Sequence, residues 1–525
     1  MAYQPVAGGE RTLLGHPRGL FVLFFTEMWE RFSFYGMRGL LVLYLTKHFL
    51  FGRQEAQLLY GAYLSMVYIT PVLGGWLADR YLGGRKAVLF GGILITVGHF
   101  LLAFEGPGGA DPRAIQLFYL GLAFVITGTG FLKANISAIV GHLYARDDRR
   151  RDPAYTIFYM GINLGAFSGA ILCGLLGEAV GWGWGFGAAG VGMVAGLIVF
   201  VVFRAELMGR AEPPAPAHLA ARVAGLSREA WIYVAAIVGV IAAWQLIQNV
   251  ALVGTLLGAF GAGLVAYILW TAVRHLPPVE RDRIFAALAL MVGSILFWAL
   301  FEQAGSSLNL FTDERVDRRF FGWEVPASVF QSINSFWIIT LAPVVAWIWT
   351  VLGRRGIEPS APAKFGLALI QVGIGFLVLV GGAAAAGAGL TPAVFIFLLY
   401  LFHSSGELCL SPVGLSAMTK MALPQMAGLL MGTWFLATAT GNFAAGVIAA
   451  ATGGENAGPE TITTVYTNVS LIAIGAGVAM ILIARPFGRL MHLDTLGAAD
   501  HALAGQGAIG EAAAAGIDVT PERRA

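Results

Sequence analysis

The chain has 525 residues, of which 57% are hydrophobic and only 12% are charged, and its formal net charge is +3. A soluble domain carries about a quarter charged residues, so this composition excludes an ordinary water-soluble protein. The basic residues lie in short connecting segments and form no stripe that could follow a nucleic-acid backbone. Cys173 and Cys409 both lie inside apolar runs, which excludes a disulfide framework and a thiolate metal site. The chain is therefore expected to face lipid, without nucleic acid, metal or cofactor.

Apolar runs long enough to cross a bilayer predict fourteen membrane-spanning helices. A spanning helix needs about 20 apolar residues, and the first apolar run is too long and too charged for a cleavable signal. The first six predicted spans cover residues 20–46, 56–79, 86–105, 114–144, 155–178 and 184–203. The last six cover residues 284–311, 327–352, 365–387, 392–420, 424–451 and 464–484. Residues 229–249 and 252–273 form a further apolar hairpin between the two groups.

This order predicts an all-α polytopic membrane protein with a major facilitator fold, in which two six-helix bundles flank two extra helices. A weak internal repeat supports the duplication, because the second span of each half contains a proline and leads to a basic pair, with Pro71 before Arg85–Lys86 and Pro343 before Arg354–Arg355. The expected domains are an N-terminal bundle (1–203), a linker with the extra transmembrane hairpin (204–283), a C-terminal bundle (284–491) and a disordered cytoplasmic tail (492–525).

The basic residues also predict the orientation of the chain. With a cytoplasmic N-terminus, 24 of the 33 Lys and Arg residues lie on the inner side and 6 on the outer side, while the other three are intramembrane. Because cytoplasmic loops are enriched in Lys and Arg, this asymmetry predicts a multi-pass protein of the cell inner membrane with both termini in the cytoplasm.

The first span carries charges that lipid would not tolerate. At roughly 100° per residue, Glu27, Glu30, Arg31 and Arg38 fall on one helix face, with Tyr35 at its border. Ionisable side chains inside a span are costly and usually face a cavity or a charged partner. The stripe is therefore expected to line a polar site, and the alternative is an ion-pair ladder that docks this helix on a neighbour.

Three further charges stand alone in later spans: Lys133, Glu302 and Glu407. One base in the first half and two acids in the second half would match a zwitterion with a free carboxylate and a free amine. Buried groups of this kind are also poised to exchange a proton. A structural pair that only locks the two halves together is the alternative.

Several motifs, in order, resemble the proton-dependent oligopeptide transporter (POT/PTR) family of the major facilitator superfamily, bacterial type. The resemblance runs from about residue 16 to 490 and includes the extra hairpin. The motifs are Glu27-x-x-Glu30-Arg31-Phe32-x-x-Tyr35-Gly36, Gly74-Gly-Trp-Leu-Ala-Asp79-Arg80, Gly128-Thr-Gly-x-x-Lys133, Phe158-Tyr159-x-x-Ile162-Asn163-x-Gly165 and Gly406-Glu407 with Ser411-Pro412.

The resemblance implies a role for each matching residue. Glu27, Glu30 and Arg31 would couple protons by exchanging salt bridges with Lys133, and Glu302 would pair with Arg38 in an outer gate. Arg38 and Lys133 would bind the peptide carboxylate, and Glu407 the peptide amine. The residues implied to line the peptide site are Tyr35, Tyr68, Asn163, Trp298, Asn334, Ser411 and Trp434. The segment from Asp79-Arg80 to Arg85-Lys86 resembles the facilitator charge latch, which would stabilise the outward-facing state.

Three positions depart from the family pattern. Phe34 stands where many members have a second tyrosine, Phe301 where some have a second glutamate, and Gly61 where some have a proton-coupling histidine. Proton coupling is therefore expected to depend on Glu27, Glu30 and Glu302, with His403 as the nearest histidine to the site.

The resulting expectation is a symporter, not an enzyme, that imports di- and tripeptides with protons across the lipid bilayer by alternating access. A same-fold carrier of another small anion such as nitrate is the alternative. The acidic Glu407 argues against it, because a buried acid repels anions. A receptor or membrane enzyme is disfavoured, because no metal cluster, phosphate loop or nucleophile–base motif is found in the sequence.

Overall fold

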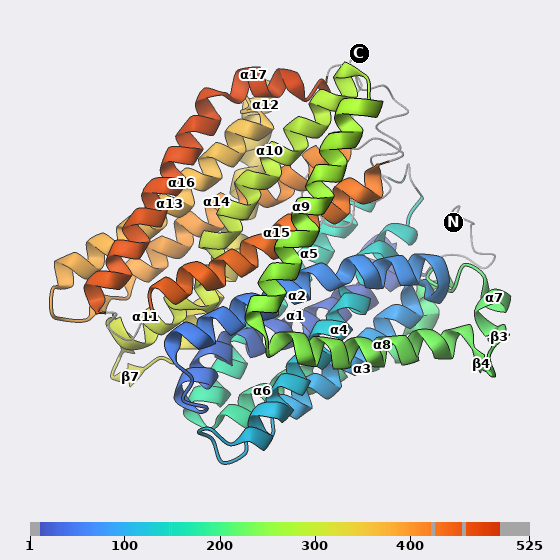
Figure 1. The fold of residues 1–525 in the computed structure, drawn as a ribbon, viewed down its shortest axis with the longest axis horizontal. Coiled ribbons are helices and arrows are strands. Elements are labelled where there is room, and N and C mark those ends of the chain that lie inside the picture. Colours follow the sequence, from blue (N-terminus) through green and yellow to red (C-terminus); the bar gives the residue numbers. More distant parts are fainter. Residues whose placement is uncertain (1–10, 146–147, 149, 422–425, 454–457, 494–525) are drawn as a thin grey trace. The chain divides into compact units, whose positions relative to one another are not determined.

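A computed structural model describes residues 11–145, 148, 150–421, 426–453 and 458–493. The described chain is almost entirely helical and divides into two compact units (Figure 1). The first unit comprises residues 1–51 and 62–253, and the second comprises residues 52–61 and 254–525. Of the tail expected at residues 492–525, residues 494–525 lie outside the described residues.

The first unit contains six long helices in chain order and one helix of the extra hairpin. The long helices are α1 (Arg18–Lys47), α2 (Arg53–Leu77, in this unit from Ala62), α3 (Gly83–Leu102), α4 (Pro112–His142), α5 (Arg151–Ala179), α6 (Trp182–Val202) and α8 (Arg228–Ile247). Short helical elements are a π-helix at Ala78–Leu82, a 3-10 helix at Arg204–Leu207 and α7 (Pro216–Ala220). Antiparallel two-residue strands pair β1 (Thr12–Leu13) with β2 (His16–Pro17) and β3 (Arg222–Val223) with β4 (Leu226–Ser227).

The second unit contains the remaining long helices. These are α9 (Val250–His275, in this unit from Gly254), α10 (Pro278–Phe301), α12 (Ser332–Arg354), α13 (Ala361–Ala386), α14 (Val394–Met421), α15 (Ala427–Ala451) and α16 (Pro459–Leu482). Shorter elements are α11 (Ser307–Arg315), α17 (Ala484–Leu490) and 3-10 helices at Glu302–Gly305 and Ala327–Gln331. Strand β5 (Val316–Asp317) pairs in parallel with β8 (Thr391–Pro392), and β6 (Arg319–Phe320) pairs antiparallel with β7 (Trp323–Glu324).

Local sequence explains several helix starts. The side chain of Asp111 accepts a hydrogen bond from the backbone N–H of Ala114 at 3.0 Å, and Pro112 occupies the first helical position. Ser227 caps α8 in the same way, through Ala230 at 3.1 Å. These side-chain acceptors satisfy backbone donors that the first helical turn leaves without partners.

The fourteen spans predicted from the sequence are present among the described residues. Twelve segments are long and apolar enough to cross a membrane, and one of them, Arg53–Leu102, contains both α2 and α3. Helix α1 has 30 residues but is not among the twelve. The charged residues on one face of α1 lower its hydropathy. With α1, the described residues contain all fourteen predicted spans.

The seventh predicted span, residues 284–311, is not one continuous helix. Helix α10 ends at Phe301, a 3-10 turn covers Glu302–Gly305, and α11 begins at Ser307. A buried hydrogen-bond network surrounds this break. Gln303 Nε2 donates to the carbonyl of Ala445 at 2.9 Å, and the hydroxyl of Tyr466 donates to Ser307 Oγ at 2.9 Å. A mid-helix 3-10 turn marks a hinge or a strained segment.

Glycines set the close approach of helices in the first unit. A Cβ on Gly165 of α5 would lie 2.1 Å from the carbonyl oxygen of Met28 on α1. A Cβ on Gly74 of α2 would lie 2.0 Å from the carbonyl oxygen of Gly130 on α4. Only glycine permits this backbone-to-backbone packing, which is typical of helix pairs in membranes.

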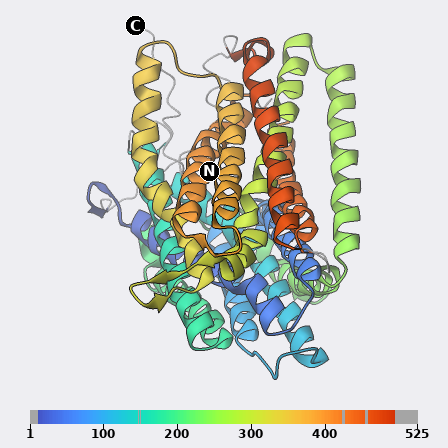
Figure 2. The same cartoon turned by 90° about the vertical axis from the view of Figure 1, so that its left-hand side faces the viewer.

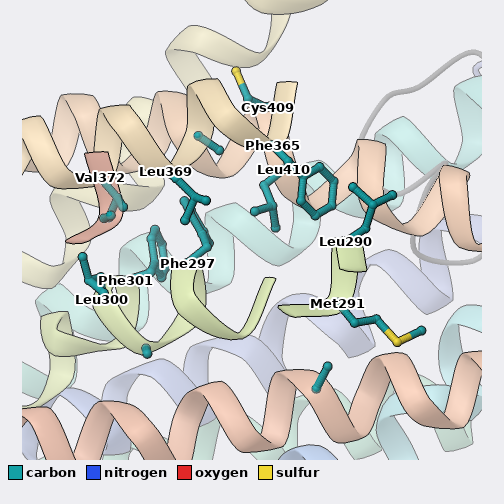
Figure 3. Close-up of a cluster of buried hydrophobic side chains, with 14 of the residues drawn as sticks. Leu290, Met291, Phe297, Leu300, Phe301, Phe365, Leu369, Val372, Cys409 and Leu410 are labelled. Carbon is teal, nitrogen blue, oxygen red and sulfur yellow. The ribbon is translucent and has the colours of Figure 1, made fainter. Parts of the chain in front are cut away.

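The apolar core of the second unit lies among α10, α13 and α14 (Figure 3). Phe297 and Leu300 of α10 meet Phe365 and Leu369 of α13, and Leu410 of α14 completes the cluster. All five side chains are at most 1% exposed. Because this core is dry and closely packed, it fixes the polar residues that the same helices carry.

The basic pair Arg85–Lys86 binds the linker region of the first unit. Arg85 forms a two-pronged ion pair with Glu212, and Lys86 Nζ lies 2.7 and 2.6 Å from the two carboxylate oxygens of Glu229 at the start of α8. Tyr233 donates to the same carboxylate of Glu229 at 2.9 Å. In this structure the latch motif thus docks the linker and α8, which the sequence did not predict.

Candidate substrate and proton site

The charged face of α1 forms a buried acid–base cluster. Arg31 Nε lies 3.0 Å from Glu27 Oε1 and 2.5 Å from Glu30 Oε2. The three residues are 3%, 1% and 4% exposed for Glu27, Glu30 and Arg31. Two carboxylates share one guanidinium, so a proton bound by one carboxylate would leave the other still paired with Arg31. Burying such a cluster costs desolvation energy.

Aromatic rings flank the two arginines of α1. The guanidinium carbon of Arg31 lies 5.4 Å from the centre of the Phe34 ring, and that of Arg38 lies 5.4 Å from the centre of the Tyr35 ring. These distances permit cation–π attraction. Phe34, which departs from the tyrosine of the resembled family pattern, therefore still offers a ring to Arg31.

Lys133 and Tyr68 meet through the packing of α4 on α2. The ammonium of Lys133 lies 3.6 Å from the centre of the Tyr68 ring, and both residues are partly buried. The contact of Gly74 with Gly130 brings the two helices together one turn away from Lys133. The first unit thus holds a second cation beside a ring that carries a hydroxyl. Salt-bridge exchange between Lys133 and the α1 cluster remains a prediction.

Asn163 lies on α5, which packs against α1. Its side chain is 7% exposed, and its amide donates to the carbonyl of Tyr159 on the same helix at 3.1 Å. A contact of Asn163 with substrate remains a prediction.

In the second unit, Glu407 of α14 lies beside Asn334 of α12. The amide nitrogen of Asn334 donates to Glu407 Oε2 at 3.2 Å and to Ser404 Oγ at 2.9 Å. Ser404 in turn donates to the backbone carbonyl of Asn334 at 3.3 Å. The amide of Asn334 thus orients the carboxylate of Glu407, and Ser404 holds that amide in place.

Glu302 and Trp298 lie at the break in the seventh span. Glu302 is 1% exposed and begins the 3-10 turn. The rings of Trp298 and Phe301 pack edge to face at 5.3 Å. Because a backbone break lies at the acid itself, a small change at this turn would move Glu302. Arg38, its expected gating partner, belongs to the first unit, and the pair remains a prediction.

Ser411 of α14 and Trp434 of α15 are the remaining residues of the second unit that are expected to line the peptide site. Ser411 follows Glu407 by one turn and precedes Pro412, which has no N–H to donate within α14. Trp434 is 5% exposed, and a Cβ on Gly414 would approach its ring to 2.4 Å. Trp434 therefore packs against α14, and its contact with substrate remains a prediction.

His403, one turn before Glu407, is buried between aromatic rings. It is 0% exposed and packs edge to face against Phe376 at 4.8 Å, with Phe301 at 6.1 Å. This apolar setting is typical of a histidine that packs among aromatic rings in a core.

Two polar residues of the site were not found by sequence reasoning. Ser404 precedes Glu407 by three residues, a spacing that places both on one helix face and could have identified it. Gln303 follows Glu302 directly, but its bond to the Ala445 carbonyl depends on the packing of α10 on α15, for which the sequence carries no signal.

Sequence relatives from bacteria match nearly the whole length of this chain. The chain is 37% identical over 493 residues to the "Uncharacterized transporter YclF" of Bacillus subtilis, which covers 92% of this chain and 96% of that protein. It is 36% identical to the "Peptide transporter YePEPT" of Yersinia enterocolitica (92% and 97% covered). It is 33% identical to a "Di-/tripeptide transporter" of Lactococcus lactis (92% and 98% covered).

Solved structures also match nearly the whole length of this chain. The crystal structure of a peptide transporter POT in complex with sulfate matches with a TM-score of 0.80 at 37% identity, covering 92% of this chain and 97% of that one. A mutant of the peptide transporter POT in complex with alafosfalin matches equally well. The family model described as "POT family" matches residues 85–466. With this match over most of its length, the chain belongs to the POT family.

Proposed function

We propose that this chain is a proton-coupled symporter that imports di- and tripeptides through the cell inner membrane, with both termini in the cytoplasm. Membership of the POT family and relatives named as peptide transporters support this assignment. The bias of 24 basic residues against 6 supports the orientation. The observation that carries the proposal is that the first unit presents cations and the second unit a carboxylate, which match the two charged ends of a peptide.

In the first unit, Arg38 and Lys133 are the cations that would bind the peptide carboxylate. Tyr35 and Tyr68 hold them by ring contacts, and Asn163 would supply an additional polar contact. In the second unit, the carboxylate of Glu407, oriented by Asn334, would bind the peptide amine. Ser411, Trp298 and Trp434 would complete the lining.

Proton coupling would use the acid–base cluster of α1. Protonation of Glu30 would remove its attraction for Arg31, which lies 2.5 Å away, so that the guanidinium, still paired with Glu27, could exchange Glu30 for another partner. Such an exchange is an electrostatic two-state switch that proton and substrate bias together. Glu302, at the break in the seventh span, would then change its pairing with Arg38. This pair would form the proposed gate.

Uptake into proteoliposomes tests this proposal. A labelled dipeptide should accumulate several-fold when the outside is acidic and should only equilibrate when no gradient is present. Labelled nitrate, which represents the anion-carrier alternative, should show no gradient-driven uptake. Accumulation of nitrate without accumulation of dipeptide would contradict the proposal and support the alternative.

A further inference from the structure

Among the described residues, three β-hairpins made of two-residue strands share one turn geometry. Strands β1–β2, β3–β4 and β6–β7 are each joined by two residues with positive φ: Leu14 and Gly15 (52° and 82°), Ala224 and Gly225 (50° and 87°), and Phe321 and Gly322 (52° and 82°). A turn with two positive φ angles favours Asn, Asp or Gly at its first position.

Two of these turns place a large apolar residue where both backbone and solvent disfavour it. Leu14 is 82% exposed and Phe321 is 109% exposed. A bulky residue in the left-handed region is strained, and an apolar side chain in water forgoes the gain from burial. Ala224 shows that the same turn forms with a methyl group alone. A residue that breaks two local rules without compensation inside the protein indicates a function.

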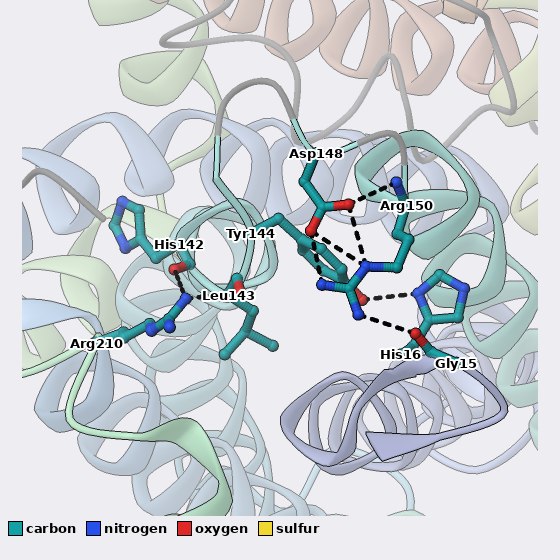
Figure 4. Close-up of polar contacts among 8 residues, drawn as sticks. All are labelled: Gly15, His16, His142, Leu143, Tyr144, Asp148, Arg150 and Arg210. Carbon is teal, nitrogen blue, oxygen red and sulfur yellow. Dashed lines mark hydrogen bonds and ion pairs between the residues drawn. The ribbon is translucent and has the colours of Figure 1, made fainter. Parts of the chain in front are cut away.

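Side-chain contacts hold the base of the β1–β2 hairpin. Arg150 donates to the carbonyl of Gly15 at 3.0 Å, and the ring of His16 is hydrogen-bonded to the hydroxyl of Tyr144 at 2.9 Å (Figure 4). Arg150 is itself clamped by Asp148 at 2.7 Å.

The β6–β7 hairpin is held by an arginine in a similar way. Arg318 donates to the carbonyl of Val325 at 2.7 Å and forms an ion pair with Glu324 at 2.8 Å. Its tip therefore also projects from a fixed base.

Both apolar tips lie next to membrane-spanning segments. Helix α1 begins at Arg18, directly after β2, and β6–β7 lies between α11 and α12. Figure 2 shows each hairpin, blue and dark yellow respectively, projecting sideways from the helices of its own unit. Exposed arginines, Arg18 and Arg319, stand beside the tips, and Trp323 is 54% exposed. Tryptophan and arginine at span ends are typical of the bilayer interface.

We propose that the Leu14 and Phe321 tips are membrane-interface anchors that insert among phospholipids. The apolar tip lies at the boundary of the acyl chains, and Arg18 and Arg319 bind headgroup phosphates. The first anchor fixes the start of α1, which carries the acid–base cluster. The second fixes the chain between the broken seventh span and the helix of Asn334. A second copy of the chain covering the tips is the competing occupant.

Site-directed spin labelling tests this proposal, because both native cysteines are buried. Leu14→Cys, Phe321→Cys and the matched Ala224→Cys would be labelled in proteoliposomes of phosphatidylethanolamine and phosphatidylglycerol. The ratio of collision with oxygen to collision with a water-soluble nickel chelate should be at least threefold higher at positions 14 and 321 than at 224. Equal ratios at the three positions would overturn the proposal. The ratio could also fall towards the value at position 224 when the protein is diluted tenfold in lipid. This result would show that a second copy of the chain, and not lipid, shields the tips from the nickel chelate, and it would also overturn the proposal.

A second pair of variants separates the tip side chain from the label. Leu13→Cys and Phe320→Cys, labelled next to the tips, are compared with and without Leu14→Asn or Phe321→Asn. Asparagine suits the left-handed turn, so the hairpin is retained. The oxygen-to-nickel ratio at the neighbouring label should fall at least twofold. An unchanged ratio would show that the apolar tip does not anchor the hairpin.

Discussion

The acidic residues of the two units are held in different ways. In the first unit, Glu27 and Glu30 both contact the guanidinium of Arg31, at 3.0 and 2.5 Å. In the second unit, Glu407 accepts a hydrogen bond from the neutral amide of Asn334 at 3.2 Å. A proton that binds Glu30 must compete with a cation that is already in place, whereas Asn334 orients Glu407 through a neutral donor.

This difference indicates that the two groups of acidic residues have different functions. Competition with Arg31 links protonation to a rearrangement of charges, as coupling requires. The attraction between a carboxylate such as Glu407 and a ligand amine is strong where water is scarce, and Asn334 orients that carboxylate. The following experiments test whether α1 couples protons while α12 and α14 recognise the peptide.

The largest effect is expected for Glu30→Gln. Glutamine cannot exchange a proton, so gradient-driven accumulation of dipeptide should be abolished, while counterflow, which needs no net proton movement, should persist in part. The measurement is uptake and counterflow in the same proteoliposomes. The exposed Glu460→Gln serves as the control and should behave as wild type. Accumulation by Glu30→Gln at the wild-type rate would show that α1 does not couple protons.

Next in size is a packing effect in the first unit. In Gly74→Ala the new methyl group would lie 2.0 Å from the carbonyl oxygen of Gly130, so α2 and α4 must separate where Lys133 meets Tyr68. We expect a loss of about 1–3 kcal/mol in stability and impaired transport. The neighbouring Gly75→Ala is the matched control, because its Cβ meets the nearest atom at an ordinary 3.6 Å. Equal thermal stability of the two variants would refute this packing account.

A smaller effect is expected for Asn334→Ala, which removes the donor that orients Glu407. Hydrogen bonds to charged groups contribute about 1.5–3 kcal/mol, and part of this loss should appear as a several-fold weaker affinity for dipeptides with a free amine. Thr340→Ala on the same helix is the control, since that hydroxyl bonds only its own helix in an exposed position. Weaker binding of amine-blocked peptides to the same extent would show that Asn334 acts on the fold and not on amine recognition.

The smallest effect concerns His16, which lies outside the spans. Burial and then the charge of Arg150 lower the pKa of His16 from 6.5, although Asp148 acts in the opposite direction. The unfolded chain therefore takes up a proton first, so stability should be constant above pH 6.5 and fall below it. Between pH 7.5 and 5.5, the thermal unfolding temperature should decrease more for wild type than for His16→Gln. Identical pH profiles would exclude this contribution.

Composition and periodicity predicted most of the fold. All fourteen spans follow from the length of the apolar runs, and the shared face of Glu27, Glu30 and Arg31 follows from helical geometry. The break at Glu302 was missed because Gly305 and Ser306 lie inside an otherwise continuous apolar run. Tertiary contacts of Gln303 and Ser307 compensate the lost helical bonds there.

Partners of surface and site charges were harder to predict than their positions. Arg85 and Lys86 were recognised as a motif, but the sequence does not show that Glu212 and Glu229 bind them. Asn334 and Glu407 were both identified as site residues, although 73 positions separate them and only the packing of α12 on α14 brings them into contact. Helical periodicity places residues on a face, but the neighbour of that face depends on the tertiary fold.

The most direct test of peptide recognition is competitive binding of three dipeptides, with free ends, a blocked amine or an amidated carboxylate, to Glu407→Gln and Arg38→Gln. Truncating one partner of a desolvated charge pair costs about 2–5 kcal/mol. Glu407→Gln should therefore weaken binding of the free dipeptide at least tenfold and binding of the amine-blocked dipeptide far less. Arg38→Gln should show the mirror pattern and spare the amidated ligand. Equal losses for all three ligands would mean that Glu407 and Arg38 hold helices together and do not recognise the ends of the peptide.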